Sequence, residues 1–327
     1  MRLGAVVVLA VCACLTISPA AAQETSAADY PSRAITMVMP LAAGSAGDVL
    51  GRLVGAKMAT DLGRPIVSEN VTGASGAIGI ERVLRAAPDG YTLLGTGDNQ
   101  LIYAPLFNKS AKFDPRTDLA PITQLAVLDW ALVANPAFPA NTIDELIALA
   151  RAKPGVINFA SGGVGSAQQI AMELLMARSH IKLTHVPYRG VTPALNDVVA
   201  GVVPLIFTAV SVAAPYLPDG KLRVLATTGR QRSTLLPDVP TVAESGLAGF
   251  EFTTWMGLLA PKDTPTAIVD RLNRSAATAV KDAALRPQMA AGGFVPVGNS
   301  PAEFKAVLAN DYARISEVVR EASIAPN

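Results

Sequence analysis

Short apolar runs of strand length alternate along the chain with longer segments whose apolar residues recur at helical spacing. The run Ile35 to Met39 has the length of a buried strand, and apolar positions from Val49 to Leu62 then follow a helical period that stops at Gly63. Such alternation produces right-handed crossovers, so it predicts an α/β fold of mostly parallel sheets flanked by helices. Further strands are expected at 65–69, 91–94, 158–160, 183–187, 204–208 and 222–227, and helices at 78–87, 168–177 and 195–200.

The last third of the chain departs from this alternation. Two long helical runs, Ile268 to Val280 and Phe304 to Val319, have little strand between them, which is typical of a tail that packs back on an earlier domain. We expect two segments, 122–136 and 250–261, to cross between domains, and a double crossover is a hinge geometry. Domain 1 would then comprise residues 30–127 plus 251–327, and domain 2 residues 128–250.

The amino terminus has the order of a secretory signal. Arg2 precedes an apolar stretch, Leu3 to Ile17, which is too short to span a bilayer and is followed by small residues at Ala20 to Ala22. We therefore expect a signal peptide at residues 1–22 and an exported mature chain. Cys12 and Cys14 lie inside this signal, so the mature chain would have no disulfide or thiol nucleophile. Their context leaves lipidation as an alternative.

The charge balance limits the partners. The chain has 27 Lys and Arg against 26 Asp and Glu, a nearly neutral balance. Nucleic acid and anionic lipid are therefore not expected as main partners. A length of 327 residues suggests about two domains.

Two glycine-containing loops lie between a predicted strand and a predicted helix. They are "PLAAGSAG", Pro40 to Gly47, and "ASGGVGSAQQ", Ala160 to Gln169. Small residues let a ligand approach the backbone, and the free N–H groups of the helix's first turn attract negative charge. The first loop lacks G-x-G-x-x-G and the second lacks the lysine of a phosphate loop, which argues against nucleotides and predicts a site for another anion.

Catalytic and metal signatures are missing. His180 and His185 are the only histidines and have no zinc-ligand spacing, so we expect no metal and no cofactor. A triad of Ser161 or Ser166 with His185 and Asp197 would lack the G-x-S-x-G elbow. The chain is therefore predicted not to be an enzyme, and an exported enzyme acting on a carboxylated substrate stays as the alternative.

Four polar side chains are candidates for the anion site. Asp48, at the start of the first helix, is expected to brace the loop rather than touch a ligand. Asp98 follows the third strand, in a loop that opens onto the same crevice. Tyr188 and Arg189 follow a strand of the second domain, and Arg189 is the cation placed to pair with a carboxylate.

The motifs together resemble a known family. "YPSRAITMVMPLAAGSAGD", "APDGYTLL", "INFASGGVGSAQQIAMELL", "HVPYRGVTPALNDVVAGVV" and "WMGLLAPKDTPTAIVDRLN" occur in the order seen in tripartite tricarboxylate transporter receptors, the Bug proteins, along nearly the whole mature length. The resemblance implies a periplasmic, two-lobed binding protein of the type II class. It would be a monomer that binds a small mono- or dicarboxylate and delivers it to a small and a large integral membrane protein. A sensor role with a signalling partner is the further alternative.

The resemblance also implies which residues hold the ligand's carboxylate, partly through ordered waters. In this sequence they are Leu41, Ala43, Gly44 and Ser45 in the first loop and Ser161, Gly163, Gly165 and Ser166 in the second, with Thr208 as a specificity candidate. Three places depart from the family pattern, and one of them is Val71 to Gly76, where the usual arginine near the loop is missing. Ser45 stands where members usually have a glycine, and Arg189 replaces the usual lysine, which keeps the charge but alters its geometry.

Overall fold

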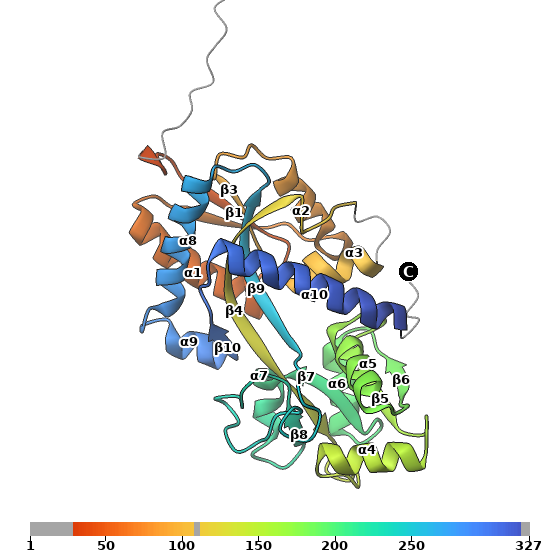
Figure 1. The fold of residues 1–327 in the computed structure, drawn as a ribbon. Helices are drawn as coiled ribbons and strands as arrows, with labels where there is room; N and C mark the ends of the chain where they lie inside the picture. Colours follow the sequence, from red (N-terminus) through yellow and green to blue (C-terminus); the bar gives the residue numbers. More distant parts are fainter. Residues whose placement is uncertain (1–28, 108–111, 322–327) are drawn as a thin grey trace, which may run out of the picture.

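The computed structural model describes residues 29–107 and 112–321, which form two α/β lobes joined by a pair of crossing strands (Figure 1). The expected signal peptide, residues 1–22, lies outside these residues. Within the described ranges, no helix has the length and apolar character needed to cross a membrane.

Lobe 1 is built on the sheet β2-β1-β3-β9-β4-β10. Helices α1 and α8 pack on one face of this sheet, while α2 and α10 pack on the other (Figure 1). Its strands are β1 (Ile35–Met39), β2 (Ile66–Asn70), β3 (Thr92–Gly97), β4 (Leu119–Ala134), β9 (Thr253–Pro261) and β10 (Phe294–Pro296). Its helices are α1 (Ala46–Leu62), α2 (Ala77–Leu84), α3 (Ala104–Phe107), α8 (Thr266–Lys281), α9 (Arg286–Ala291) and α10 (Pro301–Glu321), with a π-helical segment at Asn99–Tyr103.

Lobe 2 is built on the far half of β4 together with β7, β5 and β6 on one side and β8 on the other. Helices α4 and α5 pack on one face, and α6 and α7 on the opposite face. The strands are β5 (Asn158–Ser161), β6 (Thr184–Pro187), β7 (Leu205–Ala209) and β8 (Arg223–Thr227). The helices are α4 (Ile143–Ala152), α5 (Ala167–Ser179), α6 (Val191–Val199) and α7 (Val210–Ala213).

The sheets are mixed rather than mostly parallel. β1 pairs in parallel with β2 and β3, and β5 pairs in parallel with β6 and β7, as strand–helix alternation predicts. Every antiparallel pairing among the described strands involves β4 or β9. The physical reason is that these two strands carry the chain out of lobe 1 and back, so they run in opposite directions.

The strand β4 belongs to both lobes. It pairs with β9 as far as Asp129 and with β7 from Trp130 onward. The returning chain is tied to it by the buried Thr228, whose hydroxyl lies 2.5 Å from the Phe252 carbonyl and 3.1 Å from that of Trp130. Two adjacent strands thus cross between the lobes, which is the geometry of a hinge.

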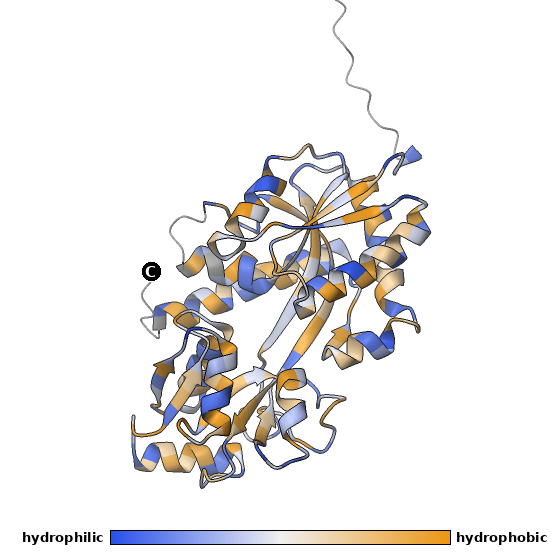
Figure 2. Ribbon diagram, turned by 180° about the vertical axis from the view of Figure 1, so that it is seen from behind, coloured by the Kyte–Doolittle hydropathy of each residue, from blue (hydrophilic) through white to orange (hydrophobic). Residues whose placement is uncertain are grey.

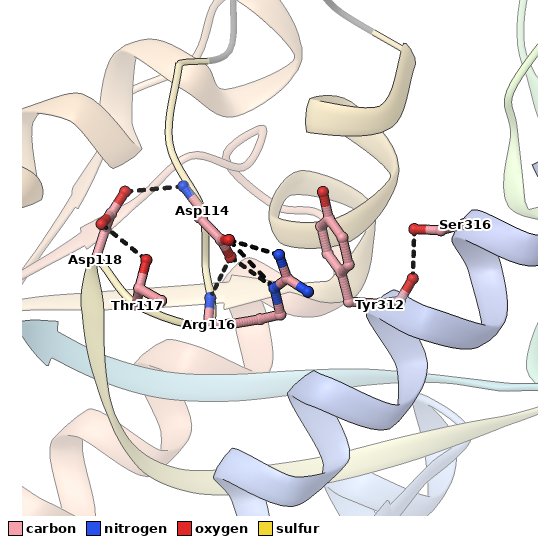
Figure 3. A network of polar contacts seen from close by, with 6 residues as sticks. All are labelled: Asp114, Arg116, Thr117, Asp118, Tyr312 and Ser316. Carbon is pink, nitrogen blue, oxygen red and sulfur yellow. Dashed lines mark hydrogen bonds and ion pairs between the residues drawn. The ribbon is translucent and has the colours of Figure 1, made fainter.

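The carboxyl-terminal helix α10 packs back on lobe 1, as predicted, and its far end also contacts α5 of lobe 2 (Figure 1). The segment before β4 anchors it. The Arg116 guanidinium lies 4.1 Å from the ring centroid of Tyr312 in α10 and is ion-paired with Asp114 at 2.6 Å (Figure 3). The helix α10 therefore touches both lobes on one side of the hinge.

The hydropathy pattern explains why the elements were readable from the sequence. In Figure 2 the central strands of both lobes are largely hydrophobic, while the outer helices alternate between hydrophobic and hydrophilic residues. The helix α4 begins after Thr142, whose side chain accepts a hydrogen bond from the Glu145 N–H at 3.2 Å. The short elements α7, α9 and β10 were not predicted, because three to six residues carry too little periodicity.

Candidate ligand-binding site

The topology turns the carboxyl ends of both sets of parallel strands toward each other. β3 is antiparallel to β9 and β9 to β4, so β1, β2 and β3 run along β4 toward lobe 2. β7 is antiparallel to β4, so β5, β6 and β7 run toward lobe 1. The loops that follow these strands therefore face each other across the hinge, which is where open α/β sheets bind ligands.

The loop after β1, Pro40 to Ser45, is held against the start of α1. Gly44 has φ 78°, in the left-handed region that favours glycine, and its N–H donates to Oδ2 of Asp48 at 2.8 Å. Ser45 is the N-cap of α1, and its Oγ accepts from the Asp48 N–H at 3.3 Å. The Ser45 hydroxyl, which departs from the family pattern, therefore caps a helix in this structure.

The loop after β5, residues 162–166, repeats this arrangement in lobe 2. Gly165 has φ 75°, and its N–H donates to Oε1 of Gln169 at 2.9 Å. Ser166 caps α5, with its Oγ 3.5 Å from the Gln169 N–H. Both loops thus contain Gly-Ser-Ala, with a side chain four residues after the glycine accepting the glycine's N–H. The brace is charged in lobe 1 and neutral in lobe 2.

These caps leave four backbone donors free. The N–H groups of Ala46 and Gly47 at the start of α1, and of Ala167 and Gln168 at the start of α5, have no acceptor among the described residues. Helix first turns with free donors and a positive dipole end suit a carboxylate. These four residues lie within the two loops predicted from the sequence, but they were not named individually as ligand contacts, although the repeated Gly-Ser-Ala could have indicated them.

The space beside the first loop is tight. A methyl group at Gly47 would lie 3.0 Å from Cδ1 of Leu41 and from Sδ of Met256. Leu41 itself is partly exposed, and Ala43 and Gly44 are exposed. The backbone of this loop is therefore accessible, while the residue behind it is closely packed.

Asp48 connects the first loop to the neighbouring strand. Its side chain is almost fully buried, and its Oδ1 accepts from Asn70 Nδ2 at 2.8 Å and from Arg52 Nε at 3.0 Å. Burial by itself raises the pKa of this carboxyl, but the hydrogen bonds from Asn70, Gly44 and Arg52 outweigh it, so the pKa is lowered. Asn70 also donates to the Leu41 carbonyl at 3.1 Å, so one polar cluster holds both ends of the loop.

Ser161 is fully buried beneath the second loop. Its Oγ lies 2.5 Å from Nε2 of His185 in β6 and accepts from the Gly163 N–H at 3.1 Å. The His185 ring stacks on Phe159, with centroids 5.0 Å apart. Burial lowers the pKa of His185. The Ser161 side chain thus faces the protein rather than solvent.

The loop after β6 is bonded to the second loop along its backbone. The Tyr188 N–H donates to the Ser161 carbonyl at 3.0 Å, and the Gly190 N–H donates to the Gly162 carbonyl at 3.1 Å. Arg189 lies between these two bonds, is exposed, and has no polar partner within the described part of the chain. The Tyr188 hydroxyl donates to Asp197 at 2.6 Å; burial and that carboxylate raise the pKa of Tyr188 to about 12.

The other two predicted residues are buried. Thr208, in β7, is 1% exposed, and Asp98 is 4% exposed. Burial raises the pKa of Asp98 well above its ordinary value, Asp311 adds to this, and backbone hydrogen bonds from Asn99 and Trp255 oppose it. Asp98 therefore lies beneath the surface, near the charged groups of Asp311 and Arg314 in α10.

Within the residues that the structure describes, no cluster of three or more His, Cys, Asp or Glu side chains could hold a metal ion. The site offers backbone N–H groups, two capping hydroxyls and one exposed guanidinium. Such a donor set can bind an anion without supplying a nucleophile or a general base aimed at it.

The fold consists of two mixed α/β lobes joined by two crossing strands, and the loops that follow the parallel strands of each lobe face each other. This arrangement is that of a periplasmic binding protein. A family model described as "Tripartite tricarboxylate transporter family receptor" matches residues 50–324, and the chain belongs to that family. It is thus a solute-binding receptor of the tripartite tricarboxylate transporter type and not an enzyme, as the sequence predicted.

Individual relatives agree with this assignment. The chain is 34% identical to protein BugT of Bordetella pertussis over 301 residues, which is 92% of each chain. A solved R. palustris protein with adipate shares 31% identity at a TM-score of 0.76, covering 91% of this chain and 100% of that one. MatC from Rhodopseudomonas palustris, with bound malate, shares 32% identity at a TM-score of 0.71, covering 89% and 100%.

Proposed function

We propose that the two facing loops of this chain close on one small mono- or dicarboxylate. The observation that carries the proposal is the repeated Gly-Ser-Ala cap, which presents free N–H groups from α1 and α5 on opposite lobes. Relatives solved with adipate and with malate support this ligand class. Carboxylates accept such N–H bonds strongly because the acceptor is charged.

The roles within the site follow from exposure. The accessible backbone of the first loop and of the second loop would touch the ligand, and Arg189 would meet a second carboxylate. Ser161, Thr208, Asp98 and Tyr188 would act from beneath, because they are buried or already hydrogen-bonded. The contact residues proposed are Leu41, Ala43, Gly44, Ser45, Ala46 and Gly47 in lobe 1, and Gly163, Gly165, Ser166, Ala167, Gln168 and Arg189 in lobe 2.

We further propose a hinge between domain 1, residues 30–127 plus 251–327, and domain 2, residues 128–250. The change of partner of β4 between Asp129 and Trp130 supports this division. The mature chain would be a monomeric periplasmic receptor, exported by a signal peptide cleaved near Ala22, that delivers its ligand to the small and large membrane subunits of a transporter. Family membership and the similarity to periplasmic binding proteins support this role.

A thermal-shift screen of the mature protein tests the ligand class. Malate, adipate and a panel of mono- and dicarboxylates should include compounds that raise Tm by about 5 °C at roughly a hundred times their Kd. Amides of the same compounds are the matched controls and should give no shift, because they lack the charge. If no carboxylate stabilised the protein, or if the amides did so equally well, the proposal would be wrong.

A further inference from the structure

The contact between Ser161 and His185 lies directly beneath the second loop. Ser161 ends β5, and its Oγ also lies 3.0 Å from the Gly163 carbonyl and accepts from the Gly163 N–H. His185 reaches the same oxygen at 2.5 Å from the adjacent strand β6. The conformation of Gly163, at φ 130°, is thereby linked through one hydroxyl to an imidazole.

The hydroxyl has one hydrogen and two acceptors within reach. If Nε2 of a neutral His185 carries no proton, the Ser161 O–H donates to it, and the Gly163 carbonyl lacks this bond. If Nε2 carries a proton, it donates to Oγ, and the Ser161 hydrogen is free for the Gly163 carbonyl. The doubly protonated ring always makes the second pattern, and it adds a positive charge under the loop.

Among the described residues, no carboxylate is hydrogen-bonded or ion-paired to His185. The paired strand β5 contributes Asn158, Phe159, Ala160 and Ser161, none of them acidic or basic. Glu173 of α5 is hydrogen-bonded to Gln169, and Asp197 of α6 to Tyr188. The flanking cations Lys182 and Arg189 add positive charge. Burial lowers the pKa of His185, which favours the neutral ring in the absence of ligand.

We propose that His185 is a positioning residue of the carboxylate site, whose protonation, acting through Ser161 on the second loop, strengthens the binding of an anionic ligand. This inference rests on the proposed function, since it requires a carboxylate at that loop. A bound anion would stabilise the imidazolium, and by linkage the imidazolium stabilises the bound anion by the same free energy.

Calorimetric titrations with malate and with adipate, from about pH 8 to about pH 5, test the proposal. In the unmodified protein, affinity should rise about fivefold or more as the pH falls through the His185 titration. His185→Gln keeps a hydrogen-bond donor but cannot titrate, so it should lose this rise. Any protonation of the ligand itself occurs equally with both proteins, so their difference isolates the histidine.

His180→Asn is the matched control, because His180 is the only other histidine and lies exposed at the end of α5. Its φ of 54° suits asparagine, and this variant should keep the full pH response. An equal pH response in His185→Gln, or loss of the response in His180→Asn, would overturn the proposal.

NMR titration of the unmodified protein gives an independent measurement if His185→Gln does not fold. The pKa of His185 should rise when malate or adipate binds, and an unchanged or lower pKa would contradict the inference. If neither ligand nor any other carboxylate binds at any pH, the proposed function fails. If one binds with no linkage to His185, the inference alone fails.

Discussion

Oδ2 of Asp48 accepts the Gly44 N–H at 2.8 Å, which holds the exposed first loop to a buried side chain in the first turn of α1. Gln169 holds Gly165 in the same way at 2.9 Å in lobe 2. The two lobes thus use one local structure, but only in lobe 1 is the brace an ion. This difference makes the two loops respond differently to substitution and to acid.

Asp48→Ala should lower the free energy of unfolding by about 2–3 kcal/mol, because it removes the charged acceptor that the Gly44 N–H and the Asn70 amide share. Gln169→Ala, the neutral counterpart, should cost about 1 kcal/mol. Urea denaturation measures both free energies of unfolding.

The pKa of Asp48 is lowered in the folded state. The stability that the ionised Asp48 contributes is therefore present above the ordinary pKa and is lost as the pH falls through the pKa of the folded state. Asp48→Asn should therefore flatten the stability profile below about pH 4, and an unchanged profile would contradict this.

Gly47→Ala should weaken carboxylate binding by about tenfold or more. The added methyl would press on Leu41 and Met256 at 3.0 Å and displace the free N–H groups of the first turn. Isothermal titration with malate or adipate measures the effect. Gly55→Ala, in the same helix, meets its nearest neighbour at 3.3 Å and should keep the affinity while raising or preserving Tm. Equal affinities in both variants would show that the Gly47 backbone is not part of the site.

Arg189→Gln should lower the affinity for a dicarboxylate by about tenfold. The affinity for a monocarboxylate of the same chain length should stay nearly unchanged. The reason is that Arg189 has no partner among the described side chains and lies beside the second loop. Arg189→Lys restores the residue usual in the family and should recover most of the loss. Competition assays with the two ligand classes give the comparison, and equal losses for both would assign Arg189 to the first carboxylate or to general electrostatics.

Thr228→Val should destabilise the protein by about 1–2 kcal/mol, because the hydroxyl that ties Phe252 to Trp130 in the hinge is buried. Thr228→Ser keeps the hydroxyl and should recover most of the stability. Small-angle scattering with and without malate or adipate should show a smaller radius of gyration for the liganded parent protein. The unliganded Thr228→Val variant should differ from the unliganded parent in its radius of gyration. Identical scattering by the two proteins would contradict a role of Thr228 in the hinge.

Local chemistry made much of this protein readable from its sequence. The strand Ile35–Met39 was predicted with the bounds that the structure shows, and the helix stop at Gly63 is a left-handed C-cap. The two strand-to-helix glycine loops were likewise predicted, because each depends on residues fewer than ten positions apart. The family followed from the same local motifs, and the family model confirms it.

Tertiary structure decided what depends on residues far apart in the chain. The sheets are mixed because β4 and β9 cross between the lobes in opposite directions. The hydrophobic periodicity of a single segment does not indicate the direction in which it crosses. Long-range contacts also joined Asn70 to Asp48 and His185 to Ser161, so that a predicted ligand-binding serine is buried under its loop. Hydrophobic periodicity specifies which face of an element is buried, but the partner it meets depends on how the whole chain packs.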